Sequence, residues 1–501
     1  MALRGGEKKS SGCFNHKKGA CMLTLAEIKK FIDDDAASMK KRLAKTGKKY
    51  YEAEHDISKY KLFYYNASGD LVEDTYRSNI KIPHPFFLEI VDQAAQYMLS
   101  GKDAFVKSDN TNLQAKLDEY FNYNTDFTAE LYDLVSGVMQ MGFGYLYAYT
   151  KEDGTTAFQC ADALGVVEVE SRYTSDGKDY IIYWYVEKID KNNKKIKRIQ
   201  VVDEENTYFF VQNGSAGIVE DKCYHGKAVR PHKTFTKDDD STIYYNSCGF
   251  IPFFRMDNNK KQVSDLHPIK ALIDDYDLMA CGMSNNIQDA AEYIVVARGF
   301  QGDSMEELIQ NIKTKKHIGV DEDGGVDFKV VDIPFEARKE KLELDEKNIY
   351  RFGFAVNINA LKDTSATTNI AIKFAYTLLD LKCNKLEIRL KQFLQQLVKV
   401  VLDEVNLMDG TDYQIKDVYF DFTREIPANM QENVQNKLTE TQKRQVEINI
   451  LLDLASYIDN KTMMELICEQ LDIDYDEIKD KLPNPDDAVN DLTNAEGLLD
   501  E

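Results

Sequence analysis

The sequence predicts an α+β fold that consists mainly of long α-helices and contains one antiparallel β-rich region. Residues 268–298 carry apolar side chains at alternating steps of four and three, which is the stripe of an amphipathic helix close to a heptad seam. Residues 372–408 carry a second long helical pattern. Between residues 145 and 251 the apolar period changes to two and turn dipeptides recur, which is typical of short β-hairpins.

Length and charge limit the classes of function. The chain has 501 residues and a formal net charge of −22, and its length predicts about two to four domains. A surface this acidic does not hold nucleic acid by releasing counterions, although it can surround DNA without adhering to it. The eight cysteines have no paired spacing, which favours reduced thiols over a disulfide framework. No apolar run reaches the ~18 residues of a membrane span, and no signal peptide is recognisable.

The N-terminal stretch, residues 1–21, is polar and rich in Gly, Lys and Ser, so we expect it to be disordered. A metal site at Cys13, His16 and Cys21 is the alternative, but three ligands at irregular spacing are a weak signal. An amphipathic helix is predicted over residues 22–48. Its apolar residues are Leu25, Ile28, Phe31 and Ile32.

Two more helical segments are predicted before the β region. The first begins at Phe86, directly after two prolines, and ends at Gly101. The second runs over residues 113–141, with a break at 122–124. The apolar face of the first segment consists of Phe87, Ile90, Val91, Ala94, Tyr97 and Met98.

The β region contains one strongly basic hairpin between residues 188 and 198. A nucleic-acid patch is one interpretation of its six Lys and Arg residues. A solvated hairpin tip is favoured, because acidic residues flank the basic ones and no aromatic side chains that could stack on bases are interleaved. The turn signals of the region are Asp-Gly at 153–154 and 176–177 and Asn-Gly at 213–214.

The helix predicted over 268–298 begins near Pro268, and Gly299 suits the left-handed residue after its end. Its narrow stripe needs flat partners on its sides, which a ring of copies would supply; a long core helix of one α-rich domain is the open alternative. The stripe is formed by Ile269, Ile273, Tyr276, Ala280, Met283, Ile287, Ala290 and Ile294. The opposite, polar face carries Asp274, Asp277, Asn285, Asp289 and Glu292, and we expect it to be solvated.

Residues 300–334 form a compact insertion. Asp303 or Ser304 is expected to cap a short helix, and a hairpin over 316–331 is expected to turn at 323–325. The acidic residues of that turn lack the spacing of a calcium loop. The apolar residues of the short helix are Met305, Leu308, Ile309 and Ile312.

The remaining segments alternate between helix and irregular structure. Pro334 leads into a helix over 335–352, whose stripe includes Phe335, Leu342, Ile349 and Phe352. Residues 356–371 are a polar loop, and a strand is predicted at 418–422. From residue 430 the chain is helical and strongly acidic, with 18 acidic and 6 basic residues in 431–501, and the stretch from Pro483 is expected to be disordered.

Few residues are candidates for chemistry. The phosphate-binding loop GxxxxGK[ST] and the motifs GxSxG, HExxH and CxxC are absent. Asp274 and Asp277 share a helix face, but no third acid is placed with them, so a metal-dependent nuclease is disfavoured. His55 and His84 have no acidic or cysteine partner at ligand spacing, and we interpret them as loop or cap residues. We therefore expect no catalytic residues, no metal and no cofactor.

In the order of its parts, the chain resembles the portal (head–tail connector) proteins of long-tailed double-stranded DNA phages, of the type found in phages of Gram-positive bacteria. The similarity runs from about residue 45 to 450. Residues 1–21 lie outside it, and ATTN at 366–369 stands where the family often has a Ser-Gly pair. The segments that carry it are YYEAEHDI (50–57), NIKIPHPFFLEIVDQAAQYMLSGK (79–102), GFIPFFRMDNN (249–259), SDLHPIKALIDDYD (264–277), RFGFAVN (351–357) and SATTNIAIKFAYTLLDLKCNK (365–385).

The resemblance implies a portal fold that assembles as a ring, usually of twelve subunits. The implied parts are a wing (22–263), a stem helix (264–299), a clip (300–334), a second stem helix (335–355), a tunnel loop (356–371), a spine helix (372–409), a further wing strand (410–429) and a crown (430–482). Residues 1–21 and 483–501 would be disordered tails.

The resemblance also implies site residues. Facing DNA in the tunnel would be Lys362, Asp363, Thr364, Ser365, Thr367, Thr368 and Lys373. The clip would dock partners through Met305, Leu308, Ile309 and Ile312. Contacts between subunits in the stem would involve Ile269, Ile273, Tyr276, Met283, Ile287, Ile294, Leu342 and Ile349.

The implied function is non-enzymatic. A portal gives double-stranded DNA a channel at one capsid vertex and docks first the terminase large subunit, which is the packaging ATPase, and then the head–tail adaptor. Its other expected partners are major capsid and scaffold proteins, with no membrane, and it would assemble in the host cytoplasm before residing in the virion. The alternative is a helical scaffold or adaptor oligomer through which no DNA passes.

Overall fold

The computed structural model describes most of the chain between residues 23 and 470. It leaves out residues 1–22, 67, 76, 152–153, 172–176, 190–194, 223–225, 237–242, 247, 291–293, 301–303, 305, 307–318, 330–334, 359–368, 426–429, 454–456, 458–459 and 471–501. The chain divides into two compact units. Unit 1 comprises Met1–Ile358 and Ala375–Glu425, and unit 2 comprises Asn359–Phe374 and Ile426–Glu501. Both predicted disordered tails, the tunnel-loop tip and the predicted clip helix lie outside the described residues.

Unit 1 begins with two helices where the sequence predicted one. α1 (Leu25–Ala37) starts at a capping box, in which the Thr24 hydroxyl accepts from the backbone N–H of Glu27 and the Glu27 carboxylate accepts from that of Thr24. Ser38 ends α1, and its hydroxyl accepts from the N–H of Lys41 to start α2 (Met39–Tyr51). A single cap residue interrupts the backbone without disturbing the apolar period, which is why the break is not visible in the pattern.

The next helices agree with the prediction. α3 (Phe86–Met98) buries all six residues of its predicted apolar face. α4 (Thr111–Leu117), a π-helical turn (Asp118–Asn122) and α5 (Thr125–Met141) reproduce the predicted helix with its break. The break occurs because the side chain of Asn124 accepts from the N–H of Phe127 and caps a new helix there.

The predicted antiparallel β region is confirmed. One three-stranded sheet has the order β14-β4-β5, and a larger sheet has the order β10-β9-β8-β7-β6 with β11 also paired to β9. The strands are β4 (Phe143–Thr150), β5 (Thr156–Ala161), β6 (Val166–Glu170), β7 (Lys178–Ile189), β8 (Lys195–Val202), β9 (Asn206–Asn213), β10 (Val219–Glu220), β11 (Val229–Pro231), β12 (Lys233–Thr236), β13 (Ile243–Asn246) and β14 (Phe253–Asp257). In the basic hairpin, Arg198 is paired with Glu187 and Asp221, and residues 190–194 of its tip lie outside the described residues.

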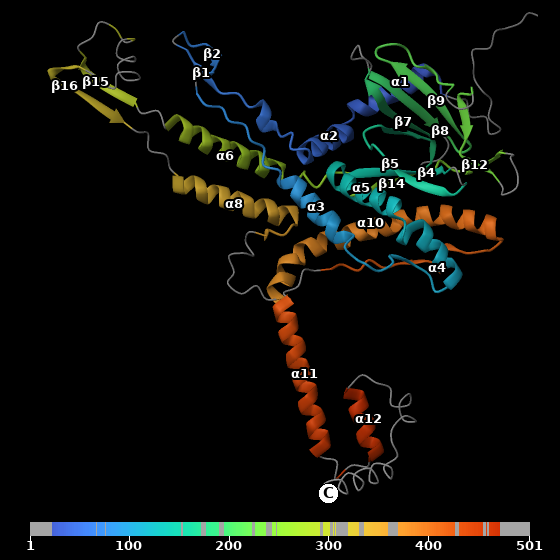
Figure 1. Ribbon diagram of the computed structural model, residues 1–501. Helices are drawn as coiled ribbons and strands as arrows, with labels where there is room; N and C mark the ends of the chain where they lie inside the picture. The colour runs from blue at the N-terminus through green and yellow to red at the C-terminus, as the bar shows by residue number, and fades with distance from the viewer. Residues whose placement is uncertain are drawn as a thin grey trace, which may run out of the picture. The chain divides into compact units, whose positions relative to one another are not determined.

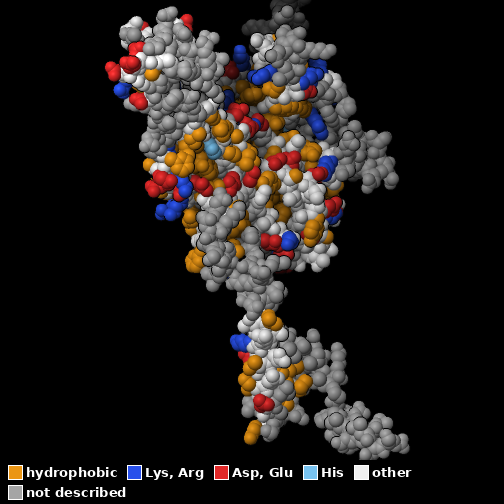
Figure 2. All heavy atoms as spheres, turned by 60° about the vertical axis from the view of Figure 1, so that its left-hand side comes forward, with side chains coloured by type: hydrophobic (Ala, Val, Ile, Leu, Met, Phe, Trp, Pro, Cys, Tyr) orange, Lys and Arg blue, Asp and Glu red, His pale blue; other side chains and the backbone are white. Residues whose placement is uncertain are grey.

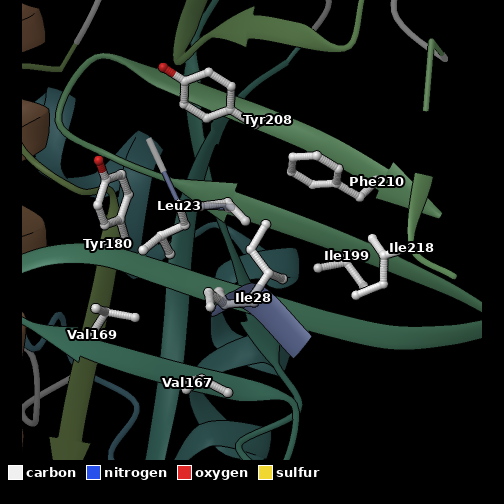
Figure 3. Packing of buried hydrophobic residues seen from close by; sticks show 11 residues of the cluster. Leu23, Ile28, Val167, Val169, Tyr180, Ile199, Tyr208, Phe210 and Ile218 are labelled. Carbon is white, nitrogen blue, oxygen red and sulfur yellow. The ribbon is translucent and has the colours of Figure 1, made fainter. Parts of the chain in front are cut away.

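Helix α1 covers one face of the larger sheet (Figure 1). Figure 3 shows Ile28 of this helix among the side chains of the strands. Ile28 is fully buried there, and Phe31 and Ile32 pack against the same cluster. Leu25, the fourth residue of the predicted apolar face, is exposed. The strands contribute Val167, Val169, Tyr180, Ile182, Ile199, Val201, Tyr208 and Phe210 to the cluster.

The helix predicted over 268–298 is shorter than expected. α6 (Lys270–Ala290) is followed by strand β15 (Ile294–Phe300), so Ile294 lies in a strand and not on the helix. Gly299, at φ 59°, lies at a register shift of that strand instead of ending the helix. The physical reason is the run Ile-Val-Val at 294–296, whose β-branched side chains are restricted in a helix and favour a strand.

Strand β15 also corrects the expected hairpin over 316–331. Its antiparallel partner is β16 (Val320–Lys329), a single strand that passes through the predicted turn at 323–325. The chain then returns along α8 (Phe335–Gly353), which contacts α6 (Figure 1). A smaller ribbon, β1 (Phe63–Tyr65) with β2 (Leu71–Glu73), precedes α3.

The long helix α10 (Asn369–Asp409) is close to its predicted span of 372–408. The short strand β17 (Tyr419–Phe420) falls within the predicted strand and pairs with β3 (Val106–Lys107). In unit 2, α11 (Met430–Asp453) and α12 (Asn460–Gln470) contact each other. Among the described residues, no helix combines the length and apolar character needed to cross a lipid bilayer.

Candidate functional site around helix α6

The polar face of α6 is not solvated but holds an extended segment, residues 78–84, which we call the strap. Every second backbone N–H of the strap donates to a side chain of α6, and the acceptors are four residues apart. The pairs are Ser78 to Asp289 Oδ1 (3.2 Å), Ile80 to Asn285 Oδ1 (2.6 Å), Ile82 to Cys281 Sγ (3.2 Å) and His84 to Asp277 Oδ1 (2.9 Å).

The two spacings match for a geometric reason. Two residues of extended chain advance by ~6.6 Å, and four residues of α-helix advance by ~6 Å. A strap that runs antiparallel to the helix therefore meets one acceptor per helical turn. The helix side chains thereby satisfy backbone donors that no neighbouring strand pairs, which a segment packed against protein requires.

Asp277 is the most buried member of this row and binds two histidines. Its side chain is completely inaccessible to solvent. Its Oδ2 lies 2.6 Å from His55 Nδ1, and its Oδ1 lies 2.8 Å from His84 Nδ1. Burial raises the pKa of Asp277, but the hydrogen bonds from the two histidines outweigh it and hold the pKa below its ordinary value.

His55 links Asp277 to the end of α2. One ring nitrogen faces the Asp277 carboxylate, and the other, Nε2, lies 3.2 Å from the backbone carbonyl oxygen of Tyr50. The ring stacks on Tyr50 with 4.4 Å between centroids.

A second polar network lies one turn nearer the start of α6. Lys270 Nζ donates to Asp56 Oδ2 at 2.8 Å and to Asp274 Oδ2 at 2.7 Å, and the Tyr50 hydroxyl also donates to Asp274. The hydrogen bond from Lys270 is the main cause that lowers the pKa of Asp56 to about 2. Asp274 and Asp277 therefore serve two separate networks, and the part of the chain that the structure describes contains no group of three or more acidic, His or Cys side chains arranged to hold a metal.

These contacts correct two expectations. Asp274, Asp277, Asn285 and Asp289 were expected on a solvated face, yet each binds another segment of the chain. His55 and His84 do lie outside helices, but their acidic partner is 222 and 193 residues away in sequence.

The sequence held two signals for the strap. Four side chains able to accept a hydrogen bond recur at steps of four on α6. Pro83 in the strap and Pro85 directly after it also occupy alternate positions at which no N–H is needed.

α6 and α8 are fastened to each other and to α3. Lys341 of α8 donates to Asp275 at 2.6 Å, and the Tyr350 hydroxyl donates to Glu89 of α3 at 2.6 Å. Gly353 lies so close to Ile90 that a Cβ there would be 2.8 Å from its Cδ1. The glycine therefore allows the end of α8 to contact α3.

The predicted contact residues of the stem fall into two groups. Ile269, Ile273 and Ile349 are fully buried within a single chain, so they belong to its core and cannot contact another copy. An apolar stripe in a sequence does not show whether the surface that covers it belongs to the same chain or to another copy. Ile294 lies in β15, as described above. Tyr276 packs against the rings of His84 and Phe86, Met283 and Leu342 are half-buried, and Ile287 is exposed.

The predicted tunnel and clip residues are mostly outside the described residues. Of the tunnel set, only Lys373 is described, and its side chain is exposed on α10. Outside the description lie Lys362, Asp363, Thr364, Ser365, Thr367 and Thr368, and likewise Met305, Leu308, Ile309 and Ile312.

Comparison with known proteins identifies the family. Residues 29–474 match the family described as "Phage portal protein, SPP1 Gp6-like". The portal protein of Bacillus phage SPP1 is 26% identical over 346 residues, which cover 69% of this chain and 66% of that protein, just under two thirds of its length. The portal protein of Clostridium phage phiCD119 is 26% identical over 423 residues, covering 81% and 87% of the two chains.

One solved structure is also similar. It is titled "Neck of native GTA particle computed with C12 symmetry" and shares 14% identity, with 77% of this chain and 89% of that chain covered at a TM-score of 0.37. The family match spans almost the whole described chain and includes the strap, α6, α8 and α10. This protein therefore belongs to the SPP1 Gp6-like family of phage portal proteins.

Proposed function

We propose that copies of this chain close into a ring at one capsid vertex and form the channel through which double-stranded DNA enters and leaves the head. The observation that carries the proposal is the family match over residues 29–474. The proposed partners are the terminase large subunit, then the head–tail adaptor, with major capsid and scaffold proteins around the ring. The ring number proposed is twelve. The channel itself performs no reaction, because the ATPase supplies the energy.

The charge of the chain supports a channel that does not adhere to DNA. A duplex that is bound at many phosphates gains affinity with each phosphate neutralised, and such a duplex would not slide. A net charge of −22 per chain opposes this adhesion. An acidic wall repels the duplex from all sides and keeps it centred.

The parts are proposed as follows. α6 and α8 form the stem at 264–299 and 335–355, and α10 forms the spine. The clip is proposed at 300–334, with β15 leading into it. The tunnel loop is proposed at 356–371, the crown at 430–482 with α11 and α12, and the wing at 22–263 and 410–429.

Imaging the purified protein in negative stain tests the proposal. We expect ring-shaped particles with a central hole wide enough for a DNA duplex, ~20 Å or more. The alternative, a scaffold or adaptor without DNA passage, predicts oligomers that are closed at the centre. A monomer at micromolar concentration, or a sealed assembly, would contradict the proposal.

Two tunnel lysines are proposed to touch DNA transiently. The polar tip at 364–368 offers hydroxyls, and Lys362 is offset by its neighbour Asp363. Replacing Lys362 and Lys373 together by Glu is expected to reduce the number of filled heads in a packaging assay. The ring should still form in images of the variant. Unchanged packaging and genome retention would refute this role.

The predicted clip helix is proposed to dock the terminase and the adaptor. Replacing Ile309 by Glu is expected to weaken adaptor binding to intact rings. The alternative is that this helix only packs between neighbouring clips, in which case ring formation fails while adaptor binding by any remaining rings is unchanged. A pull-down of adaptor by rings isolated beforehand separates the two results.

A further inference from the structure

The strap continues into an exposed apolar ridge at the start of α3. Ile82, Pro85 and Leu88 are all exposed, and we call these three residues the strap ridge. They stand at steps of three residues and follow the segment that binds α6. Figure 2, turned so that the left-hand side of Figure 1 comes forward, shows hydrophobic side chains interspersed with acidic and basic ones on the face that it presents. An apolar ridge on a tightly fastened segment indicates a contact outside the chain.

An apolar groove of about 760 Å³ lies between residues 258–268, the start of α6, the end of α8 and α10. We call it the α10 groove. Leu272, Phe352, Phe354 and Leu381 contribute apolar side chains, and the last three are between 44% and 56% exposed. Phe354 is held at φ 56°, a conformation that a bulky residue rarely adopts. Its ring is therefore presented at the surface by the way α8 ends.

The outer stripe of α10 changes character along the helix. Its first half exposes Leu378, Leu381 and Ile388. Its second half exposes Gln392, Gln396 and Lys399, and an exposed leucine, Leu407, recurs on this face near the end of the helix. The apolar residues of the face are concentrated in the first half, beside the groove, which indicates that a partner covers that half.

The ridge and the groove lie on opposite sides of unit 1. On α6, Leu272 faces the groove and Cys281 faces the strap, and nine residues at ~100° each place them about 180° apart. On α10, Cys383 lies 3.7 Å from the Ala94 carbonyl oxygen of α3. Leu381, two residues earlier, is ~160° away around the helix. A ring built from head-to-tail contacts needs two different surfaces placed in this way.

The two surfaces also lie at similar positions along the axis of α6 and carry charges of opposite sign. Leu272 and Asp277, which binds the strap, are separated along α6 by only ~8 Å. Lys261 and Lys385 line the groove, in addition to Lys382, which is paired with Asp265. Two carboxylates of α3 flank the ridge: Glu89 and Asp92, which follow Leu88 by one and four residues. Opposite charges thus surround two apolar surfaces.

We propose that the strap ridge of one copy sits in the α10 groove of the next copy, and that this contact closes the ring. The partner is a second copy of this chain. The inference rests on the proposed ring and adds which surfaces meet. The contact is head to tail, so Leu88 of one copy meets Leu381 of its neighbour and never another Leu88.

A pair of cysteines tests the contact. The full chain carrying both Leu88→Cys and Leu381→Cys is expected to give a ladder of cross-linked multimers on a non-reducing gel after mild oxidation. Each single variant, and the unaltered chain with its native cysteines, is the control and should give no such ladder. Rings that show no ladder in the double variant, or dimers from a single variant, would overturn the proposal. Absence of rings in images of the unaltered protein would instead refute the proposed function.

Placing a charged side chain on the strap ridge provides a second test of the proposed contact. Leu88→Glu is expected to reduce the fraction of chains in rings at least tenfold, measured by size-exclusion chromatography and negative stain. Leu43→Glu, at a leucine of α2 that is 38% exposed against 37% for Leu88, is the matched control and should leave the fraction unchanged. Equal unfolding transitions of the two variants show that the loss is one of assembly. Equal ring fractions would contradict the contact.

Discussion

Asp277 connects three parts of the chain through one carboxylate. It accepts hydrogen bonds from His55, which follows α2, and from His84 at the end of the strap, while its own backbone belongs to α6. A buried carboxylate of this kind is tolerated only when it has hydrogen-bond partners, and here two histidines supply them. The arrangement makes the position of α6 relative to α2 and α3 depend on a small number of polar atoms.

Replacing Asp277 by Asn is expected to destabilise the chain strongly. The amide can keep only one of the two acceptor oxygens that face His55 and His84, and breaking a buried pair costs about 3–5 kcal/mol. Urea unfolding followed by circular dichroism measures the change. Asp275→Asn, on the same helix at an ion pair that is partly exposed, is the control and should change the free energy of unfolding by less than about 1 kcal/mol. Similar losses in both variants would argue against a special role of Asp277.

The pKa of Asp277 predicts how stability depends on pH. Because its pKa is lower in the folded chain than in the unfolded chain, the stabilisation is fully present above the unfolded value, about 3.9, and is lost as pH falls toward the folded value. Asp56, with a pKa of about 2, contributes in the same direction. Unfolding free energies measured between pH 6 and pH 3 should fall more steeply for the unaltered chain than for Asp277→Asn. Parallel curves would show that the carboxylate does not carry this dependence.

At the scale of elements, side chains of α6 provide hydrogen-bond acceptors for the strap, an extended segment that is not part of a β-sheet. Acceptors at every fourth residue of α6 satisfy donors at every second residue of the strap. The strap in turn fixes where α3 begins, since Phe86 follows it directly and packs edge-on against Tyr276 with 4.8 Å between centroids. The position of α6 thereby determines where the neighbouring helix α3 begins.

Removing a single acceptor is expected to loosen the strap locally. Asn285→Ala leaves the N–H of Ile80 without its 2.6 Å partner and should cost about 1 kcal/mol. Hydrogen exchange resolved by residue should show faster exchange at Ile80, with smaller changes at His84. Gln288→Ala, at an exposed position of the same helix, serves as the control. If the Ile80 amide exchanges equally fast before and after the change, the hydrogen bond is not formed in solution.

At the scale of the whole molecule, charge and assembly belong together. More than half of the net charge of −22 lies in residues 431–501. The rest of the chain contains both acidic and basic residues, which partly cancel. The proposed ring would present a strong negative potential to a phosphate backbone. It would depend on local apolar and oppositely charged contacts to hold together copies that repel each other overall.

Free rings are therefore expected to bind a DNA duplex weakly. Fluorescence anisotropy of a labelled 40-base-pair duplex at 0.15 M salt should show no saturation up to ~10 µM ring, because the acidic surface offers few cations to release counterions. The Lys362 and Lys373 double variant should behave in the same way. Submicromolar binding with a steep dependence on salt would contradict a non-adhesive channel.

Periodicity alone was sufficient to predict the class of most segments. The apolar face of α3, the long span of α10, the interrupted helix ending at Met141 and the antiparallel region between 145 and 251 all follow from local spacing. They follow because a helix or strand must bury one face, so apolar residues recur in the local sequence with the period of that element. The end of α6 was placed wrongly, since the apolar stripe continued into the β-branched residues of β15.

What each face packs against is a long-range property. Ile269 and Ile287 belong to the same predicted stripe, yet the first is core and the second is surface, because the chain around α6 covers only the first part of the stripe. In the sequence, Asp277 cannot be distinguished from a solvated acid, because its partners His55 and His84 are more than 190 residues away. Local spacing defines which side chains share a face, whereas the fold defines which distant atoms meet it, since burial and charge compensation arise only when separate segments come into contact.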